Sequence, residues 1–292
     1  MPFVTVGREN SHDIDLYFED HGNGQPVVLI HGFPLNGASW EKQISPLLEA
    51  GHRVIHYDRR GFGRSSQPVE GYDYDTFAAD LKVLMDRLDL SDAVLAGFSM
   101  GTGEVTRYVA SYGSERVSKA ALFGAIPPFL LQTDDNPEGV PRDIFEGFKE
   151  AIRQDRPAFY KQFFDNFNNA DVLMGNRLSE QAWQQQFSIA IQSSAIGTLR
   201  CVDTWLTDFR DDLPKLDVPV LLVHGTADRI LPIDVTARRL EGLIGDLRFV
   251  EIEDGPHNIG WTHPEEVNRA LLDFIAGREP TAVGQARVVV AA

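Results

Sequence analysis

The sequence has one cysteine, Cys201, among 292 residues. A single thiol excludes an internal disulfide framework and a cysteine-rich zinc site. Positive charge is also scarce, because 27 lysine and arginine residues stand against 43 aspartate and glutamate residues, for a net charge of −16. Such a chain lacks the basic surface that binds nucleic acid, and an anionic membrane would repel it. We therefore expect neither partner.

Long apolar runs are missing as well. The longest, Ala120–Leu131, is interrupted by Pro127 and Pro128 and is too short to span a bilayer. No basic segment followed by an apolar one, the pattern of a secretion signal, opens the sequence. The composition, with 43% hydrophobic and 24% charged residues, is that of a globular protein with a sizeable core. These features together predict a cytoplasmic protein.

Short apolar runs bounded by glycine, proline or aspartate are typical of buried parallel strands. They recur along this chain at Val27–Ile30, Arg53–Tyr57, Ala93–Ala96, Ala120–Phe123, Val218–Val223 and Leu247–Ile252, and Ile14–Phe18 alternates as an edge strand does. Apolar residues at helical spacing lie between several of these runs, at 40–48, 74–88 and 100–112. This alternation predicts an α/β protein whose mostly parallel sheet is flanked by helices.

One long segment, residues 127–213, has helical patterns but no convincing strand. We interpret it as a helical cap over the carboxyl edge of the sheet. The core domain then consists of residues 1–126 and 214–277. The cap holds half of the 18 phenylalanines, which predicts an apolar roof, although aromatic residues at helical spacing also pack within a subdomain.

The motif G-x-S-x-G occurs once, as Gly97-Phe98-Ser99-Met100-Gly101. A predicted strand leads into it and a predicted helix leaves it, which is the context in which a serine sits on a tight turn with its hydroxyl at the sheet edge. Small residues at both ends of the motif permit the close approach of strand and helix. Ser99 is therefore the candidate nucleophile.

A serine hydroxyl needs a base, and the base needs a carboxylate that orients it. Asp228 follows the predicted strand Val218–Val223, and His257 follows Leu247–Ile252, so both are expected at the same sheet edge as Ser99. The chain order serine, acid, histidine is the one found with this motif. The sequence predicts that Ser99, His257 and Asp228 form a catalytic triad.

Other acids compete with Asp228. Asp254 lies close to His257 along the chain but opens the same turn, and Asp234 has the position of a helix-capping charge. Three more, Asp208, Asp211 and Asp212, lie in the predicted cap. We expect none of them to orient the histidine.

Backbone N–H groups are the expected oxyanion donors, one after the nucleophile and one after an early strand. Met100 supplies the first and Phe33 the second. His31 and His224 end or follow strands, and we interpret both as structural. His52 and His56 offer no third ligand and no H-E-x-x-H pattern, so the sequence predicts no metal site.

With these residues in view, the chain resembles the α/β-hydrolase fold and, more closely, the cofactor-free bacterial haloperoxidases, also described as perhydrolases. The matching stretches are HGFPLNGASW, YDRRGFGRSSQP, GFSMGTGEV, TWLTDFR, HGTADRILP and PHNIGWTHPEEVN. They span residues 2 to 276. The resemblance implies a mostly parallel eight-stranded sheet with a helical cap insertion.

The resemblance also implies an activity. Members form an acyl-serine from a short carboxylic acid or ester, and hydrogen peroxide converts it to a peracid that oxidises halide. Esterase activity accompanies this, no metal or other cofactor takes part, and the members form trimers or assemblies of trimers. Here the triad is Ser99, Asp228 and His257, and Phe33, Met100 and Trp205 are candidates for the pocket wall.

Two features depart from the family pattern. Asn258 follows His257 where glycine is more usual, and residues 278–292 extend beyond the resemblance. We expect this tail to be disordered, with Val288–Val290 as an alternative edge strand.

Alternative activities remain open. A carboxylesterase or lactamase without a peroxidase role would use the same residues, and so would a ligand receptor that keeps the triad. A dehalogenase or epoxide hydrolase needs an aspartate at the position of Ser99, which this chain lacks.

Overall fold

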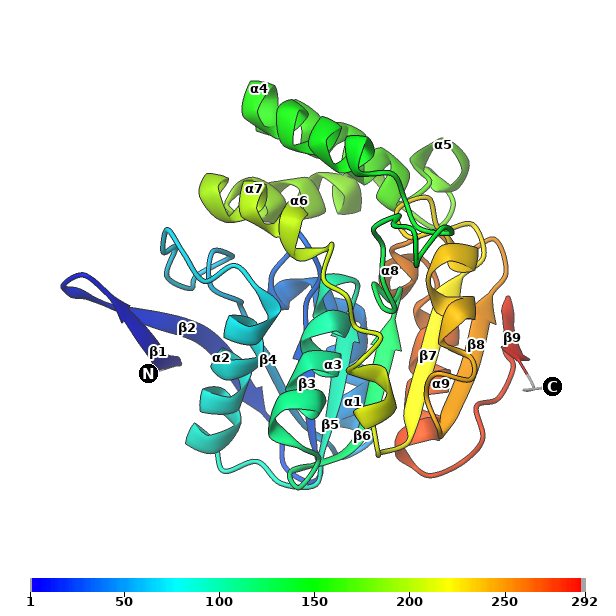
Figure 1. The fold of residues 1–292 in the computed structure, drawn as a ribbon. Coiled ribbons are helices and arrows are strands. Elements are labelled where there is room, and N and C mark those ends of the chain that lie inside the picture. The colour runs from blue at the N-terminus through cyan, green and yellow to red at the C-terminus, as the bar shows by residue number, and fades with distance from the viewer. Residues whose placement is uncertain (1, 290–292) are drawn as a thin grey trace.

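The computed structural model describes residues 2–289. Its centre is a nine-stranded sheet in the order β1-β2-β4-β3-β5-β6-β7-β8-β9 (Figure 1). The strands from β3 to β8 are parallel, whereas β1, β2 and β9 pair antiparallel to their neighbours. Their bounds are β1 Phe3–Glu9, β2 His12–His21, β3 Pro26–Ile30, β4 Arg53–Tyr57, β5 Ala93–Phe98, β6 Val117–Phe123, β7 Val220–Gly225, β8 Leu247–Ile252 and β9 Ala286–Val289.

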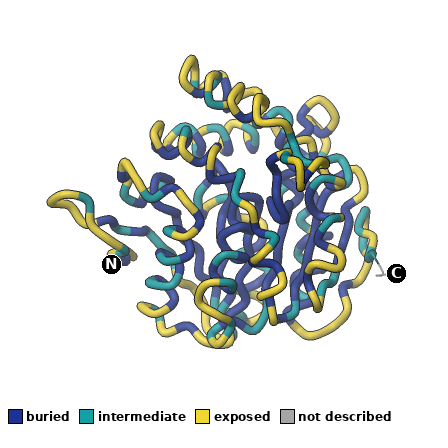
Figure 2. The backbone as a smooth tube through the Cα atoms, in the orientation of Figure 1, coloured by how far each residue is buried: buried dark blue, intermediate teal, exposed yellow. Residues whose placement is uncertain are grey.

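Helices flank the sheet, as predicted. Helix α1 (Glu41–Glu49) packs against α9 (Pro264–Ile275), and α2 (Tyr74–Arg87) packs against α3 (Met100–Tyr112). Asp73 begins α2 as its N-cap, because its side chain accepts a hydrogen bond from the N–H of Thr76 at 2.8 Å. Strands β3 and β5 are almost completely buried, so the core follows the parallel strands (Figure 2).

The segment between β6 and β7 folds into helices, with no strand that joins the sheet. These helices are α4 (Arg142–Phe167), α5 (Ala170–Leu173), α6 (Glu180–Ile191) and α7 (Ala195–Thr204), and they lie above the sheet in Figure 1. Asp155 breaks α4 with a non-helical backbone, and its carboxylate caps the next turn by accepting from the N–H of Ala158 at 3.0 Å. Pro157 follows this break at the first helical turn, where proline needs no N–H partner.

The sheet has one strand more than the eight expected. β9 pairs with β8, Glu251 with Arg287 among the partners, and the side chains of this pair also form an ion pair. The expectation of a disordered tail is therefore wrong for the described part of residues 278–292, and the edge-strand alternative holds for Val288 and Val289. Pairing satisfies backbone groups that β8 would otherwise expose at an edge. Val290 lies outside the described residues.

One strand was not predicted, and the bounds of several others differ from those predicted. Strand β1 was not anticipated, because its solvent-exposed hairpin lacks a strong apolar pattern. Strand β7 begins at Val220 rather than Val218 and ends at Gly225 rather than Val223, so His224 and Gly225 belong to the strand. No helix among the described residues is both long and apolar enough to cross a bilayer.

Candidate active site

Ser99 lies on the sharp turn between β5 and α3. Its backbone has φ 52° and ψ −118°, a region that side-chain-bearing residues seldom occupy and that must be held by the surroundings. Two hydrogen bonds hold it: the N–H of Ser99 donates to the Phe123 carbonyl at 2.8 Å, and the N–H of Thr102 donates to the Ser99 carbonyl at 2.9 Å. The turn predicted from G-x-S-x-G is thus present.

Two glycines permit the packing around this turn. A Cβ atom on Gly101 would lie 2.3 Å from the Ile30 carbonyl oxygen, which is much closer than van der Waals contact. A Cβ atom on Gly32 would lie 2.8 Å from the Cβ of Ser99. The loop after β3 lies directly against the serine turn, so a side chain at Gly32 or Gly101 would have no room.

Asp228 and His257 are joined by a short hydrogen bond. The Nδ1 atom of His257 lies 2.6 Å from Oδ2 of Asp228, and both side chains are fully buried. The other carboxylate oxygen, Oδ1, accepts from the backbone N–H groups of Ile230 and Leu231, each at 2.8 Å. Burial raises the pKa of Asp228, but the neighbouring His257 and hydrogen bonds from His224 and His257 outweigh it and hold this pKa well below its usual range.

The other ring nitrogen of His257 is left free. Because an ionised carboxylate only accepts hydrogen bonds, Nδ1 carries the proton and Nε2 presents a lone pair. The Nε2 atom is buried and has no hydrogen-bond partner among the described residues, Ser99 included. The rings of Phe98 and Phe167 lie 5.1 and 5.0 Å from the imidazole, centre to centre, and fix its position.

The rival acids do not contact His257. Asp254 is exposed, with φ 54°, and its backbone N–H donates to the Thr226 hydroxyl at 2.9 Å. Asp234 pairs with Arg238, Asp208 pairs with Arg210, and Asp212 pairs with Arg107. Only Asp228, of the acids weighed from the sequence, is hydrogen-bonded to the imidazole in the part of the chain that the structure describes.

The two expected oxyanion donors, the N–H groups of Phe33 and Met100, occupy the two segments that meet at Ser99. Phe33 follows Gly32, which abuts the serine, and Met100 is the first residue of α3. Within residues 2–289 neither N–H donates to another protein group. The first N–H groups of a helix have no intrahelical acceptor, so that of Met100 is open to a ligand.

His31 and His224, the two histidines at strand ends, differ in what they contact. His31 is buried between backbone groups, with Nδ1 2.9 Å from the Gly32 carbonyl and Nε2 accepting from the N–H of Arg59 at 2.9 Å. Burial first, and the Arg59 charge second, lower the pKa of His31 well below its usual value. His224, by contrast, contacts Asp228 at 3.1 Å, a relation that the sequence pattern did not suggest.

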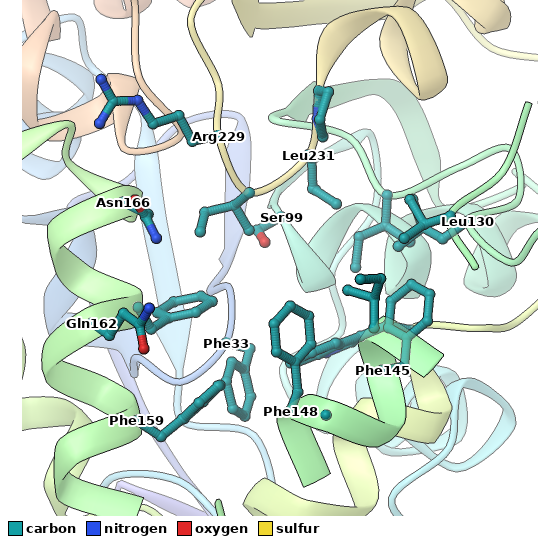
Figure 3. A pocket seen from close by; sticks show the side chains of 18 of the residues that line it. Phe33, Ser99, Leu130, Phe145, Phe148, Phe159, Gln162, Asn166, Arg229 and Leu231 are labelled. Carbon is teal, nitrogen blue, oxygen red and sulfur yellow. The ribbon is translucent and has the colours of Figure 1, made fainter. Parts of the chain in front are cut away.

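A cavity of about 450 Å³ opens over Ser99 and is roofed by α4 (Figure 3). Its wall is largely apolar, with Phe33 and Trp205 as predicted, their rings 4.7 Å apart. Met100 does not line it, contrary to expectation, because its side chain is fully buried at the start of α3. The other apolar lining residues are Ile126, Leu130, Val140, Ile144, Phe145, Phe148, Ala151, Phe159, Phe163, Ile230, Leu231 and Pro232.

Polar groups in the wall escaped the sequence analysis. Gln162 and Asn166 lie one turn apart on α4 and point toward the cavity (Figure 3). Arg229 also lines the cavity, and its guanidinium reaches Asp171 of α5 at 2.7 Å. Gln162 and Asn166 are four residues apart, a helical spacing that is visible in the sequence. The sequence did not indicate, however, that this face of α4 covers Ser99.

Asn258, which stands beside His257 where the family more often has glycine, is hydrogen-bonded to the cap. Its side-chain amide donates to Asn168 at 2.9 Å, and Asn168 in turn donates to Gln186 of α6 at 2.8 Å. The backbone N–H of Asn258 donates to the Phe167 carbonyl at 3.0 Å. The histidine loop is thereby tied to the cap helices.

Comparison with known proteins agrees with this architecture. Residues 25–264 match the alpha/beta hydrolase fold family. A protein of Synechocystis sp., provisionally named a non-haem chloroperoxidase, is 62% identical over 94% of this chain and 100% of its own length. The bifunctional esterase/perhydrolase of Acinetobacter calcoaceticus is 32% identical over 94% of this chain and 99% of its own. The crystal structure of a bromoperoxidase from Bacillus anthracis superposes with a TM-score of 0.90, at 44% identity, and covers 94% of this chain and 99% of that one.

The fold, the serine turn and the family match define an α/β hydrolase, an enzyme of the serine hydrolase type. Within that class the chain belongs to the non-haem haloperoxidases and perhydrolases. The resemblance described from the sequence is therefore confirmed.

Proposed function

We propose that the protein is a haloperoxidase/perhydrolase and esterase that acts through an acyl enzyme on Ser99, with His257 as base and Asp228 as its orienting acid. The 2.6 Å hydrogen bond between His257 Nδ1 and Asp228 Oδ2 is the observation that carries the proposal. It fixes the tautomer in which Nε2 can accept the serine proton.

The first half of the reaction forms the acyl enzyme. The Ser99 hydroxyl oxygen attacks the carbonyl carbon of an ester or acid while His257 Nε2 takes the hydroxyl proton. The N–H groups of Phe33 and Met100 stabilise the negative oxygen of the tetrahedral intermediate. The imidazolium then returns the proton to the departing alkoxide or hydroxide, which leaves as alcohol or water.

The second half transfers the acyl group to hydrogen peroxide. His257 Nε2 removes a peroxide proton as the peroxide oxygen attacks the acyl carbon, and Ser99 leaves with that proton. The product peracid oxidises a halide ion in solution, with one proton consumed, to the hypohalous acid and the parent carboxylic acid. Attack by water in place of peroxide gives ordinary ester hydrolysis.

The Ser99→Ala variant tests the shared acyl enzyme. Ester hydrolysis and peroxide-dependent bromination should both fall by at least about 10⁴-fold, because both pass through one acyl-serine. Ser188→Ala, on the cap helix α6, is the matched control and should retain both activities. Bromination that survives in Ser99→Ala would refute the mechanism.

Two kinetic measurements separate the alternatives. A burst of p-nitrophenol from p-nitrophenyl acetate followed by steady turnover identifies an enzyme, whereas a receptor releases one equivalent at most. The ratio of peracid to free acid at fixed peroxide distinguishes a perhydrolase from an esterase or lactamase that uses water alone.

Quaternary structure and location are also proposals. From family membership we expect a homotrimer or an assembly of trimers, and light scattering of the purified protein measures the mass directly. The expected cytoplasmic location follows from the sequence pattern and is tested by cell fractionation.

A further inference from the structure

Three side chains with metal-binding atoms meet on the neighbouring strands β2 and β4, away from the cavity. Glu19 and His21 are two residues apart on β2 and so share one face of the strand. His56 on β4 is the cross-strand partner of Glu19. These three residues, which we term the β2–β4 cluster, offer two imidazole nitrogens and a carboxylate oxygen within 4.8 Å of one another.

The distances in the cluster match a zinc coordination sphere. Nε2 of His21 lies 3.0 Å and Nε2 of His56 lies 3.5 Å from Oε2 of Glu19. Ligand atoms about 2.0–2.2 Å from a tetrahedral Zn²⁺ are separated from one another by about 3.3–3.6 Å. The two imidazole nitrogens lie within 4.8 Å of each other, so side-chain rotations would bring the three atoms onto one ion.

The carboxylate is already oriented for this task. The Tyr17 hydroxyl donates to Oε1 of Glu19 at 2.6 Å, and the Arg64 guanidinium lies 3.9 Å from the same oxygen. Oε2 is the atom that faces both histidines. A hydrogen-bonded outer partner of this kind fixes the orientation of a metal ligand and strengthens binding.

Access to the cluster is open on one side. The side chain of His56 is 6% exposed, whereas those of His21 and Glu19 are 47% and 33% exposed. An ion can enter from solvent, and water can take a fourth position. None of the three residues lines the cavity over Ser99, so this would be a separate site.

We propose that Glu19, His21 and His56 bind one divalent transition-metal ion, with Zn²⁺ as the best-fitting ion. Two imidazoles and one carboxylate form a donor set that zinc accepts. The ion would fasten β2 to β4 and so hold the β1–β2 hairpin, which projects from the body of the molecule (Figure 1). The sequence analysis found no third ligand for His56 and His52, whereas the structure places Glu19 and His21, from a different strand, beside His56.

Titration calorimetry of the tag-free full chain with ZnCl₂ tests the proposal. The wild type should bind one ion per chain, and His21→Asn and Glu19→Gln should each lose that site. His12→Asn is the matched control, because His12 is an exposed histidine at the opposite end of β2 and lies outside the cluster. His257→Asn should also keep the site, which separates it from the active-site imidazole.

Further measurements of Zn²⁺ affinity, thermal stability and hydrogen exchange extend the test. Tyr17→Phe should weaken Zn²⁺ binding about tenfold, as loss of an outer partner does. Zn²⁺ should raise the melting temperature of the wild type and slow hydrogen exchange in β1 and β2, without doing so in His21→Asn. Ester turnover should survive dialysis against a chelator. Unchanged binding in both His21→Asn and Glu19→Gln, or no stoichiometric binding by the wild type, would overturn the proposal.

Discussion

Nε2 of His224 lies 3.1 Å from Oδ2 of Asp228, the same oxygen that His257 contacts at 2.6 Å. The backbone N–H of Ala125 donates to Nδ1 of His224 at 3.2 Å, so the imidazole proton is on Nε2. That N–H is directed both to the Leu231 carbonyl at 2.8 Å and to the carboxylate. Two imidazoles thus share one buried oxygen.

Removal of this second imidazole should slow catalysis without weakening substrate binding. A hydrogen bond to a charged group contributes about 1.5–3 kcal/mol, so His224→Leu should lower kcat by about ten- to a hundredfold while KM changes little. His224→Gln keeps a donor and should recover part of the loss. Equal kcat values for His224→Leu and the wild type would assign His224 a purely structural role.

Asp228 should orient His257 and stabilise its cation without taking the proton. Asp228→Asn favours the wrong imidazole tautomer, so kcat on one ester should fall by about 10⁴, or roughly 5 kcal/mol. Asp254→Asn is the control and should turn over normally, since Asp254 is exposed and makes no contact with the imidazole. The reverse outcome would mean that Asp254 is the orienting acid.

The Asp228 carboxylate should make the free energy of unfolding depend on pH in the acid range. Its folded pKa lies below the ordinary value, so the unfolded chain binds its proton first as the pH falls. The stabilisation is present above about pH 4 and is lost as the pH falls toward the folded pKa. Urea unfolding at several pH values should show the difference between wild type and Asp228→Asn shrinking below about pH 4. A constant difference would contradict this.

Asn258 should hold the cap in place through Asn168. Asn258→Gly restores the residue usual in the family but deletes the 2.9 Å hydrogen bond, and leaves the Asn168 carbonyl oxygen buried without that donor. We expect a loss of about 1–3 kcal/mol in the free energy of unfolding. Asn176→Gly, in the cap turn after α5, serves as a comparison for a solvent-exposed asparagine. A melting temperature equal to that of the wild type would argue against this role of Asn258.

Much of the core could be predicted from local patterns. Buried parallel strands carry continuous apolar runs, and the serine turn requires small residues at Gly97 and Gly101 whatever lies elsewhere. Helix 100–112 was located to the residue, because a turn motif marks its start and a glycine its end. β1 was not predicted and β9 was predicted only as an alternative to disorder, because edge strands bury too little apolar surface to show a strong pattern.

The sequence by itself determined the fold class, the catalytic serine and the chain order of serine, acid and histidine. Each of these features depends only on a short stretch of neighbouring residues. Only the tertiary structure decided which further groups meet across the chain: His224 on the carboxylate of Asp228, Asn258 on Asn168, and Glu19 opposite His56. Contacts of this kind depend on strand register and loop direction, which are fixed when the whole core packs and which no local spacing records.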